Sequence, residues 1–187
     1  AGVFKYFEEI CQVPRPSKKE EKIIAYLKAF GAKHNLETKV DEAGNVLIKK
    51  PATPGKENLQ TVVLQSHIDM VCEKNNDVQH DFLTDPIETE IDGEWLKAKG
   101  TTLGADNGIG VATELAILAD DSIEHGPLEC LFTVDEETGL TGAFELKEGF
   151  MSGDILLNLD SEDEGEIFIG CAGGIDSVAE FAYKEVE

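Results

Sequence analysis

The chain has 187 residues and a formal net charge of −22. This charge argues against nucleic acid and anionic membrane surfaces as partners, because no basic stripe is present to neutralise phosphates. No apolar run reaches the roughly 20 residues of a membrane span, and no signal segment opens the chain. The four cysteines form no C-x-x-C pair, which is typical of reduced thiols in the cytosol. We therefore expect a cytoplasmic, acidic α/β protein.

The N-terminal part of the chain is predicted to form two helices and a pair of strands. Apolar residues recur at helical spacing between residues 3 and 11 and indicate a short amphipathic helix, which prolines end. Ser17 and Glu20 have the spacing of a capping box, which predicts the start of a second helix. Residues 37–40 and 46–49 are predicted to be strands joined by a turn.

An apolar strand over residues 61–66 leads directly into His67 and Asp69. Ligands of open α/β sheets gather beyond the carboxyl ends of such strands. Residues two apart in an extended chain point to the same side, and a carboxylate can fix the tautomer of a metal-binding imidazole. By itself this short pattern is equally compatible with a polar surface loop.

The middle of the chain is predicted to contain loops, a hairpin and a helix. Residues 71–86 are polar and indicate a surface loop, with the shaping of a substrate pocket as the alternative. Residues 88–96 predict a hairpin that turns at Asp92-Gly93. Four glycines between residues 100 and 110 surround Asp106, just before a predicted helix over 110–119. Asp106 could be a simple helix cap, and the glycine spacing excludes a phosphate-binding loop.

Two further apolar strands end in carboxylates. Residues 128–134 lead into the acidic run 135–137, and residues 155–159 lead into Asp160. Neighbouring carboxylates repel one another unless water or cations stabilise them. An exposed acidic turn is the plain alternative, but three strand ends and a helix start share this chemistry. One imidazole among converging carboxylates is the ligand set of a two-cation hydrolytic site. Residues 166–169 and 175–186 are predicted to be further strands.

At these motifs the chain resembles the co-catalytic zinc metallopeptidases of the aminoacylase and glutamate-carboxypeptidase type, and most closely the carnosinase-like aminoacyl-histidine (Xaa-His) dipeptidases. The matching stretches are residues 64–71, 100–110, 132–139, 157–162 and 170–176. Five ordered motifs make the resemblance specific, although each alone is weak. It implies an α/β fold in which helices flank a mixed, mostly parallel sheet.

The resemblance also implies a role for each site residue. His67 would bind one metal and Asp69 would orient it, Asp106 would bridge both metals, Glu137 would bind the second, and Asp160 would join His67 on the first. Glu136 would be the general base, although strand alternation alone does not separate it from Asp135. A cis peptide bond is expected between Asp106 and Asn107. The cofactors would be two divalent ions, with zinc expected and manganese or cobalt also suited to histidine and carboxylate ligands.

The expected reaction is hydrolysis of small peptides, namely dipeptides of the Xaa-His type. Another amide hydrolase of the same clan, such as a tripeptidase, deacylase or broad dipeptidase, is the nearest alternative, and a non-catalytic acidic metal-binding scaffold is the alternative from another class. Residues 1–173 would be the first half of the catalytic domain, and residues 174–187 would open an inserted lid or dimerisation domain. A final histidine ligand is missing, so this segment alone is expected to be inactive, and a homodimer would form through the inserted domain.

Overall fold

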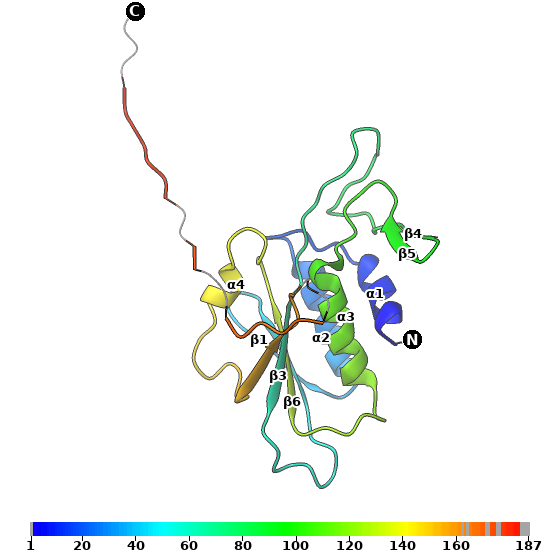
Figure 1. Ribbon diagram of the computed structural model, residues 1–187, viewed down its shortest axis with the longest axis vertical. Helices are drawn as coiled ribbons and strands as arrows, with labels where there is room; N and C mark the ends of the chain where they lie inside the picture. The colour runs from blue at the N-terminus through cyan, green and yellow to red at the C-terminus, as the bar shows by residue number, and fades with distance from the viewer. Residues whose placement is uncertain (1, 162, 164, 171–172, 175–176, 184–187) are drawn as a thin grey trace, which may run out of the picture.

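The computed structural model describes residues 2–161, 163, 165–170, 173–174 and 177–183. Its centre is a five-stranded sheet in the order β1-β2-β6-β3-β7 (Figure 1). The strands are β1 Glu37–Val40, β2 Val46–Lys50, β3 Val62–His67, β6 Leu128–Thr133 and β7 Ile155–Asn158. The pairs β1–β2 and β2–β6 are antiparallel, whereas β6–β3 and β3–β7 are parallel. The predicted mixed α/β sheet is confirmed.

Three helices cover one face of this sheet (Figure 1). They are α1 Gly2–Cys11, α2 Glu21–Lys33 and α3 Ala105–Ala119. Successive residues of a strand point to opposite faces, so Val46 and Ile48 of β2 join the helix-covered core while Leu47 faces away from it. On the far face, Leu47 packs with Val63, Leu131 and the segment 146–151 that follows the short helix α4, Thr141–Phe144. This two-sided burial explains why the central strands have unbroken apolar sequences.

Several predicted elements differ from the structure in detail. The hairpin consists of β4 Thr89–Asp92 and β5 Trp95–Ala98, so its turn lies at Gly93-Glu94, one residue later than predicted. The strand predicted over 166–169 is wrong, because these residues are exposed and have no partner strand among the described residues. The same holds for the described part, 177–183, of the strand predicted over 175–186. A strand without a hydrogen-bonding partner is not stable in water.

The capping box predicted at the start of α2 is also wrong. Glu20 is the N-cap residue of α2, but its side chain makes no capping hydrogen bond. The Ser17 hydroxyl instead donates to Asp69, 52 residues away. In a capping box the serine hydroxyl binds the backbone at the start of its own helix. Here the Ser17 hydroxyl makes a tertiary contact instead.

Cys11, Cys72 and Cys130 are free thiols, and Cys171 lies outside the described residues. In the part of the chain that the structure describes, no helix has the length and apolar character needed to cross a membrane.

Candidate functional site

The predicted site residues come together at the carboxyl ends of three neighbouring strands. His67 is the last residue of β3, and its register partner Thr133 is the last residue of β6. The acidic run 135–137 therefore begins two residues beyond the level of His67. Because β7 runs parallel to β3 on its other side, Asp160 follows at the same edge of the sheet. Parallel strands thus deliver these side chains to one place, as expected for an α/β sheet.

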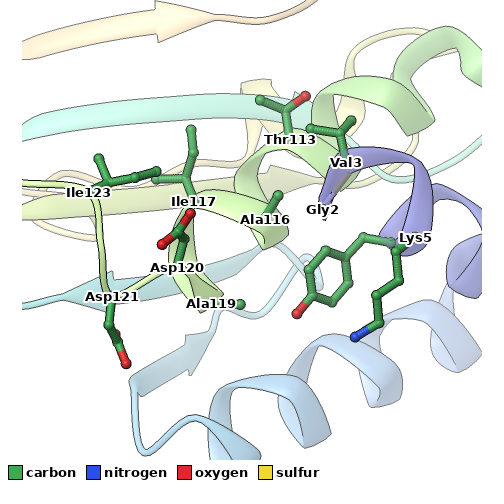
Figure 2. A pocket seen from close by; sticks show the side chains of 11 residues that line it. Gly2, Val3, Lys5, Thr113, Ala116, Ile117, Ala119, Asp120, Asp121 and Ile123 are labelled. Atoms are coloured by element: carbon green, nitrogen blue, oxygen red, sulfur yellow. The ribbon is translucent and has the colours of Figure 1, made fainter.

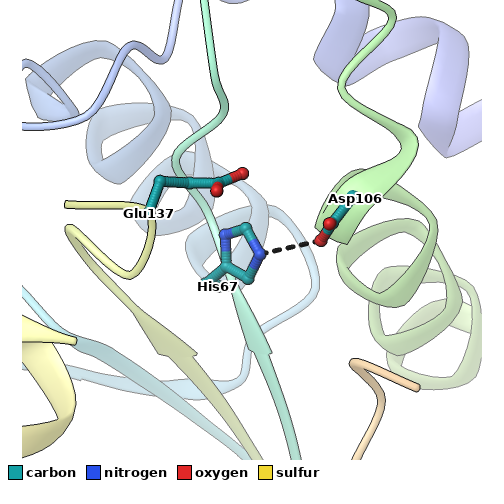
Figure 3. Close-up of side chains that lie close together, drawn as sticks. All are labelled: His67, Asp106 and Glu137. Atoms are coloured by element: carbon teal, nitrogen blue, oxygen red, sulfur yellow. Dashed lines mark hydrogen bonds and ion pairs between the residues drawn. The ribbon is translucent and has the colours of Figure 1, made fainter. Parts of the chain in front are cut away.

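His67 is the centre of the cluster (Figure 3). Its Nε2 atom lies 3.0 Å from Asp106 Oδ1, 3.6 Å from Asp160 Oδ1 and 3.9 Å from Glu136 Oε2. The ring itself is buried. Burial alone lowers the pKa of His67, but hydrogen bonds to Asp69 and Asp106 and the charge of Asp160 raise this pKa to about 9. With this pKa the imidazole is protonated at neutral pH, and its positive charge compensates part of the negative charge of the surrounding carboxylates.

Asp69 holds the other side of the imidazole ring. Its Oδ1 atom lies 3.2 Å from His67 Nδ1, and the carboxylate is fully buried. The same carboxylate accepts hydrogen bonds from the backbone N–H groups of Glu136 at 3.1 Å and Glu137 at 3.2 Å. Burial raises the pKa of Asp69, but hydrogen bonds from His67, Ser17 and the Glu136 backbone hold this pKa below its usual value. In a neutral imidazole, an ionised Asp69 would fix the Nδ1–H tautomer, in which Nε2 can bind a metal.

Asp106 reaches the cluster from the start of α3. The peptide bond between Asp106 and Asn107 is cis, as the resemblance implies, and both residues depart from helical backbone angles. Asn107 Nδ2 donates to Asp160 Oδ1 at 2.8 Å, while its Oδ1 atom accepts from Gly110 N at 3.1 Å. A Cβ atom at Gly110 would lie 2.1 Å from Asn107 Oδ1. Glycine is therefore required there for Asn107 to connect the helix start to the loop after β7.

The donor set fits a divalent cation. His67, Asp106 and Glu137 each offer one ligand atom, and these atoms lie within 4.8 Å of one another. Desolvation and the neighbouring carboxylates raise the pKa values of Glu137 and Asp160, against the opposing effect of His67. Burial and mutual repulsion both disfavour the ionised carboxyls, and a bound cation would relieve the repulsion. Imidazole nitrogen with carboxylate oxygens is a ligand set that suits zinc.

Glu136 and Asp135 are distinguished by their surroundings. The Asp135 carboxylate is buried and accepts hydrogen bonds from Thr138 and Thr141, each at 2.6 Å. Glu136 is partly exposed, lies beside His67, and has a pKa raised by desolvation. Asp135 therefore stabilises its own turn, and Glu136 is the carboxylate that faces the candidate site.

A second carboxylate cluster lies behind the first and consists of Glu20, Asp69 and Asp135, all buried. The carboxylate oxygens of this cluster accept hydrogen bonds from hydroxyl and backbone N–H donors, so they are not free to bind a metal. Asp135 N donates to Glu20 Oε1 at 3.0 Å, and Ser17 Oγ donates to Asp69 Oδ2 at 2.7 Å. We regard this cluster as support for the site and not as a further metal centre.

Arg15, Ser17 and Asn107 contact the site but were not singled out from the sequence as site residues. Arg15 donates to the backbone carbonyls of Ile68 and Asp69. A capping-box pattern marked Ser17, and an expected cis peptide bond marked Asn107, but neither signal indicates the contacts that these residues make with Asp69 and Asp160. The signal at Arg15 is its unusual position between two prolines, which points to a turn.

A separate hollow of about 470 Å³ lies between α1 and the C-terminal half of α3 (Figure 2). Small and apolar side chains line it, with Lys5, Asp120 and Asp121 as its charged groups. Asp106 is at the opposite end of α3, and a helix of 15 residues is about 20 Å long. This hollow is therefore distinct from the carboxylate cluster.

Residues 63–181 match the model of peptidase family M20/M25/M40. The matched region holds every residue of the candidate site, and the chain belongs to this family.

Two named relatives are similar over most of this chain. It is 56% identical over 170 residues to the cytosol non-specific dipeptidase of Escherichia coli. It is 57% identical, with a TM-score of 0.89, to the crystal structure of aminoacylhistidine dipeptidase from Vibrio alginolyticus. Each match covers 91% of this chain but 35% of the relative. A tripeptidase structure from Staphylococcus aureus matches at 25% identity and a TM-score of 0.72, covering 86% of this chain and 43% of that one.

Proposed function

We propose that this chain carries one part of the active site of a metal-dependent dipeptidase that cleaves Xaa-His and related dipeptides. The observation that supports this most strongly is the convergence of His67, Asp106, Glu137 and Asp160 on one point, with Asp69 behind the imidazole. The names of the two dipeptidase relatives support the substrate class. The chain spans 35% of their length, so the activity of the whole protein is part of this proposal.

His67 and Asp160 would hold one divalent ion, Glu137 would hold a second, and Asp106 would bridge the two. Zinc suits these donors, and manganese or cobalt would be accepted by the same ligands. When bound, the ions would supply an acidified water molecule and polarise the peptide carbonyl. Asp69 would keep His67 in the tautomer that binds.

Glu136 would act as the general base. It would take a proton from the attacking water and deliver it to the nitrogen of the departing amine. Burial raises the pKa of Glu136 above that of an ordinary glutamate, and a base whose pKa lies closer to the working pH transfers protons more efficiently in both directions. Its partial exposure gives a substrate access to the carboxylate.

The remaining parts of the proposal concern the rest of the protein. The cytoplasm is the proposed location, in keeping with the name of the E. coli relative. Residues 1–173 would form the first half of the catalytic domain, and residues 174–187 would open an inserted domain through which a homodimer forms. A final histidine ligand would come from outside this segment.

A substrate panel on the full-length polypeptide tests the function. The zinc-loaded protein should hydrolyse Xaa-His dipeptides, and removal of metal with a chelator should abolish this activity. Preferential hydrolysis of tripeptides or N-acylated amino acids would instead indicate another amide hydrolase of the family. Tight zinc binding without hydrolysis of any of these substrates would indicate a non-catalytic metal-binding scaffold.

A further inference from the structure

The α1–α2 connector, residues 12–20, passes behind the loops that carry the site residues. Its backbone is joined to the loop after β3, because Met70 N donates to Arg15 O at 3.2 Å and Pro16 forms an isolated bridge with Met70. Three of its side chains then reach three different loops. These side chains are Arg15, Ser17 and Glu20.

Arg15 joins the loop after β3 to the turn before α3. One guanidinium nitrogen donates to Ile68 O at 3.2 Å and Asp69 O at 3.1 Å, and the other donates to Gly104 O. A Cβ atom at Gly104 would lie 2.5 Å from the guanidinium. Gly104 also has a φ of 70°, so glycine is required there for two reasons.

The guanidinium of Arg15 is buried in an unusual way. The residue is 3% exposed, and its hydrogen bonds go to backbone carbonyls. Burying a cation without a directly bonded carboxylate is unfavourable, and this burial lowers the pKa of Arg15. The negative charges of Asp69 and Asp106 act on it in the opposite direction. Through its hydrogen bonds to both, the buried Arg15 side chain fixes the distance between the loop after β3 and the turn before α3.

Glu20 and Asp69 together hold the turn after β6. Glu20 Oε1 accepts from Asp135 N at 3.0 Å, and the two oxygens of Asp69 accept from the next two backbone N–H groups, those of Glu136 and Glu137. Three consecutive N–H groups are thus bound by two buried carboxylates. Ser17 Oγ in turn holds Asp69 Oδ2 at 2.7 Å. The connector therefore contacts the turn both directly and through Asp69.

We propose that the α1–α2 connector is a positioning element of the site, in which Arg15, Ser17 and Glu20 set the relative placement of the loops that bear His67, Asp106 and Glu136-Glu137. None of the three side chains would touch substrate or metal. The inference rests on the proposed metal-dependent function, but it makes a separate claim about metal affinity. Groups that orient metal ligands typically change metal affinity about 10- to 100-fold when they are removed.

The test measures zinc affinity by calorimetry on the metal-free full-length polypeptide, together with its thermal midpoint and, separately, kcat and KM. The variants are Ser17→Ala, Glu20→Ala, Glu20→Gln and Arg15→Met. Lys19→Met and Glu21→Ala are matched controls, because both residues are exposed and adjacent to the tested positions. The Glu20→Gln variant retains an oxygen that can accept from Asp135 N.

We expect Ser17→Ala and Glu20→Ala to weaken zinc binding about 10- to 100-fold, with lower kcat and little change in KM. Glu20→Gln should recover most of the affinity, and both controls should bind zinc as the unchanged protein does. The midpoint of metal-free Ser17→Ala should fall by no more than about 2–4 °C, the upper bound for the loss of one hydrogen bond. If Arg15→Met does not fold, the other variants still decide the question.

Zinc affinities within about threefold of the unchanged protein for Ser17→Ala and Glu20→Ala, well below the typical 10-fold effect, would overturn the inference. So would equal losses in Glu20→Ala and Glu20→Gln. If the unchanged protein binds no zinc, both the inference and the proposed function are wrong. If it binds zinc but cleaves no dipeptide, only the proposed function is wrong, because the affinity comparison does not depend on turnover.

Discussion

Asp69 Oδ1 lies 3.2 Å from His67 Nδ1, and both side chains are almost completely buried. The same carboxylate binds the backbone N–H groups of Glu136 and Glu137. One side chain therefore fixes the orientation of the imidazole and the position of the acidic turn together. Any change at Asp69 is expected to affect both.

Replacing Asp69 with asparagine should weaken zinc binding about 10- to 100-fold. Asparagine keeps the size of the side chain, but one of its two acceptor oxygens becomes an N–H₂ donor, which must then face another donor. Calorimetric titration of the metal-free protein with zinc measures the effect. Asp77→Asn, at an exposed position outside the site, serves as the control. Unchanged affinity in Asp69→Asn would show that His67 is oriented by something else.

Glu136→Gln should lower kcat about 10²- to 10⁴-fold while zinc remains bound. The amide cannot accept a proton from water, but Glu136 is not among the proposed metal ligands. The measurement is steady-state hydrolysis of an Xaa-His dipeptide with metal content determined on the same sample. Asp135→Asn is the comparison, because its carboxylate binds Thr138 and Thr141, and it should mainly reduce stability. A variant at Glu136 that retains activity would remove it from the role of base.

Zinc should raise the thermal midpoint of the unchanged protein. A ligand that binds only the folded state at 100 times its dissociation constant adds about 2.7 kcal/mol to the free energy of unfolding. Removing one ligand with Glu137→Gln should reduce this gain. It should also relieve the cost of a buried charge and of repulsion in the metal-free protein, since desolvation and then the carboxylates of Asp106 and Asp69 raise the pKa of Glu137. Thermal denaturation with and without zinc measures both effects. A midpoint that zinc leaves unchanged would argue against a metal site.

We expect Glu114 to make the free energy of unfolding depend on pH. It is fully buried in α3, and desolvation raises its pKa well above the usual value, against an opposing effect of the neighbouring Ser66 hydroxyl and Cys130 thiol. At pH values between the ordinary glutamate pKa and this raised pKa, Glu114 is therefore protonated in the folded state and ionised in the unfolded state. The contribution of Glu114 is fully present below the ordinary glutamate pKa, and it is lost as pH rises toward the higher pKa of the folded state.

Glu114→Gln should remove this pH dependence and raise the free energy of unfolding at pH 8 by about 1–3 kcal/mol relative to the unchanged protein. Urea denaturation at pH 5, 6, 7 and 8 measures it. Glu8→Gln, at an exposed position, should leave the slope unchanged. An identical pH slope in Glu114→Gln would mean that this carboxyl is not the titrating group.

The sequence predicted the central strands and the main helices well, because burial on both faces gives long apolar runs and amphipathic helices give regular spacing. It also predicted which residues meet at the site. His67, the acidic run 135–137 and Asp160 each follow an apolar strand, and adjacent parallel strands bring such ends together.

What the sequence did not predict depends on long-range contacts. Ser17 and Glu20 match a local capping pattern, yet they bind Asp69 and Asp135. The apolar residues of 166–169 suggested a strand that has no partner among the described residues. A local sequence pattern cannot show which distant part of the chain supplies a hydrogen-bonding partner.

The most direct test is a crystal structure of the zinc-loaded protein, with metal positions located by anomalous scattering. We predict zinc within bonding distance, about 2.0–2.2 Å, of His67 Nε2 and of carboxylate oxygens of Asp106, Glu137 and Asp160. Zinc found only on exposed acidic side chains, with His67 still bound to Asp106 and no metal between them, would contradict the proposed site.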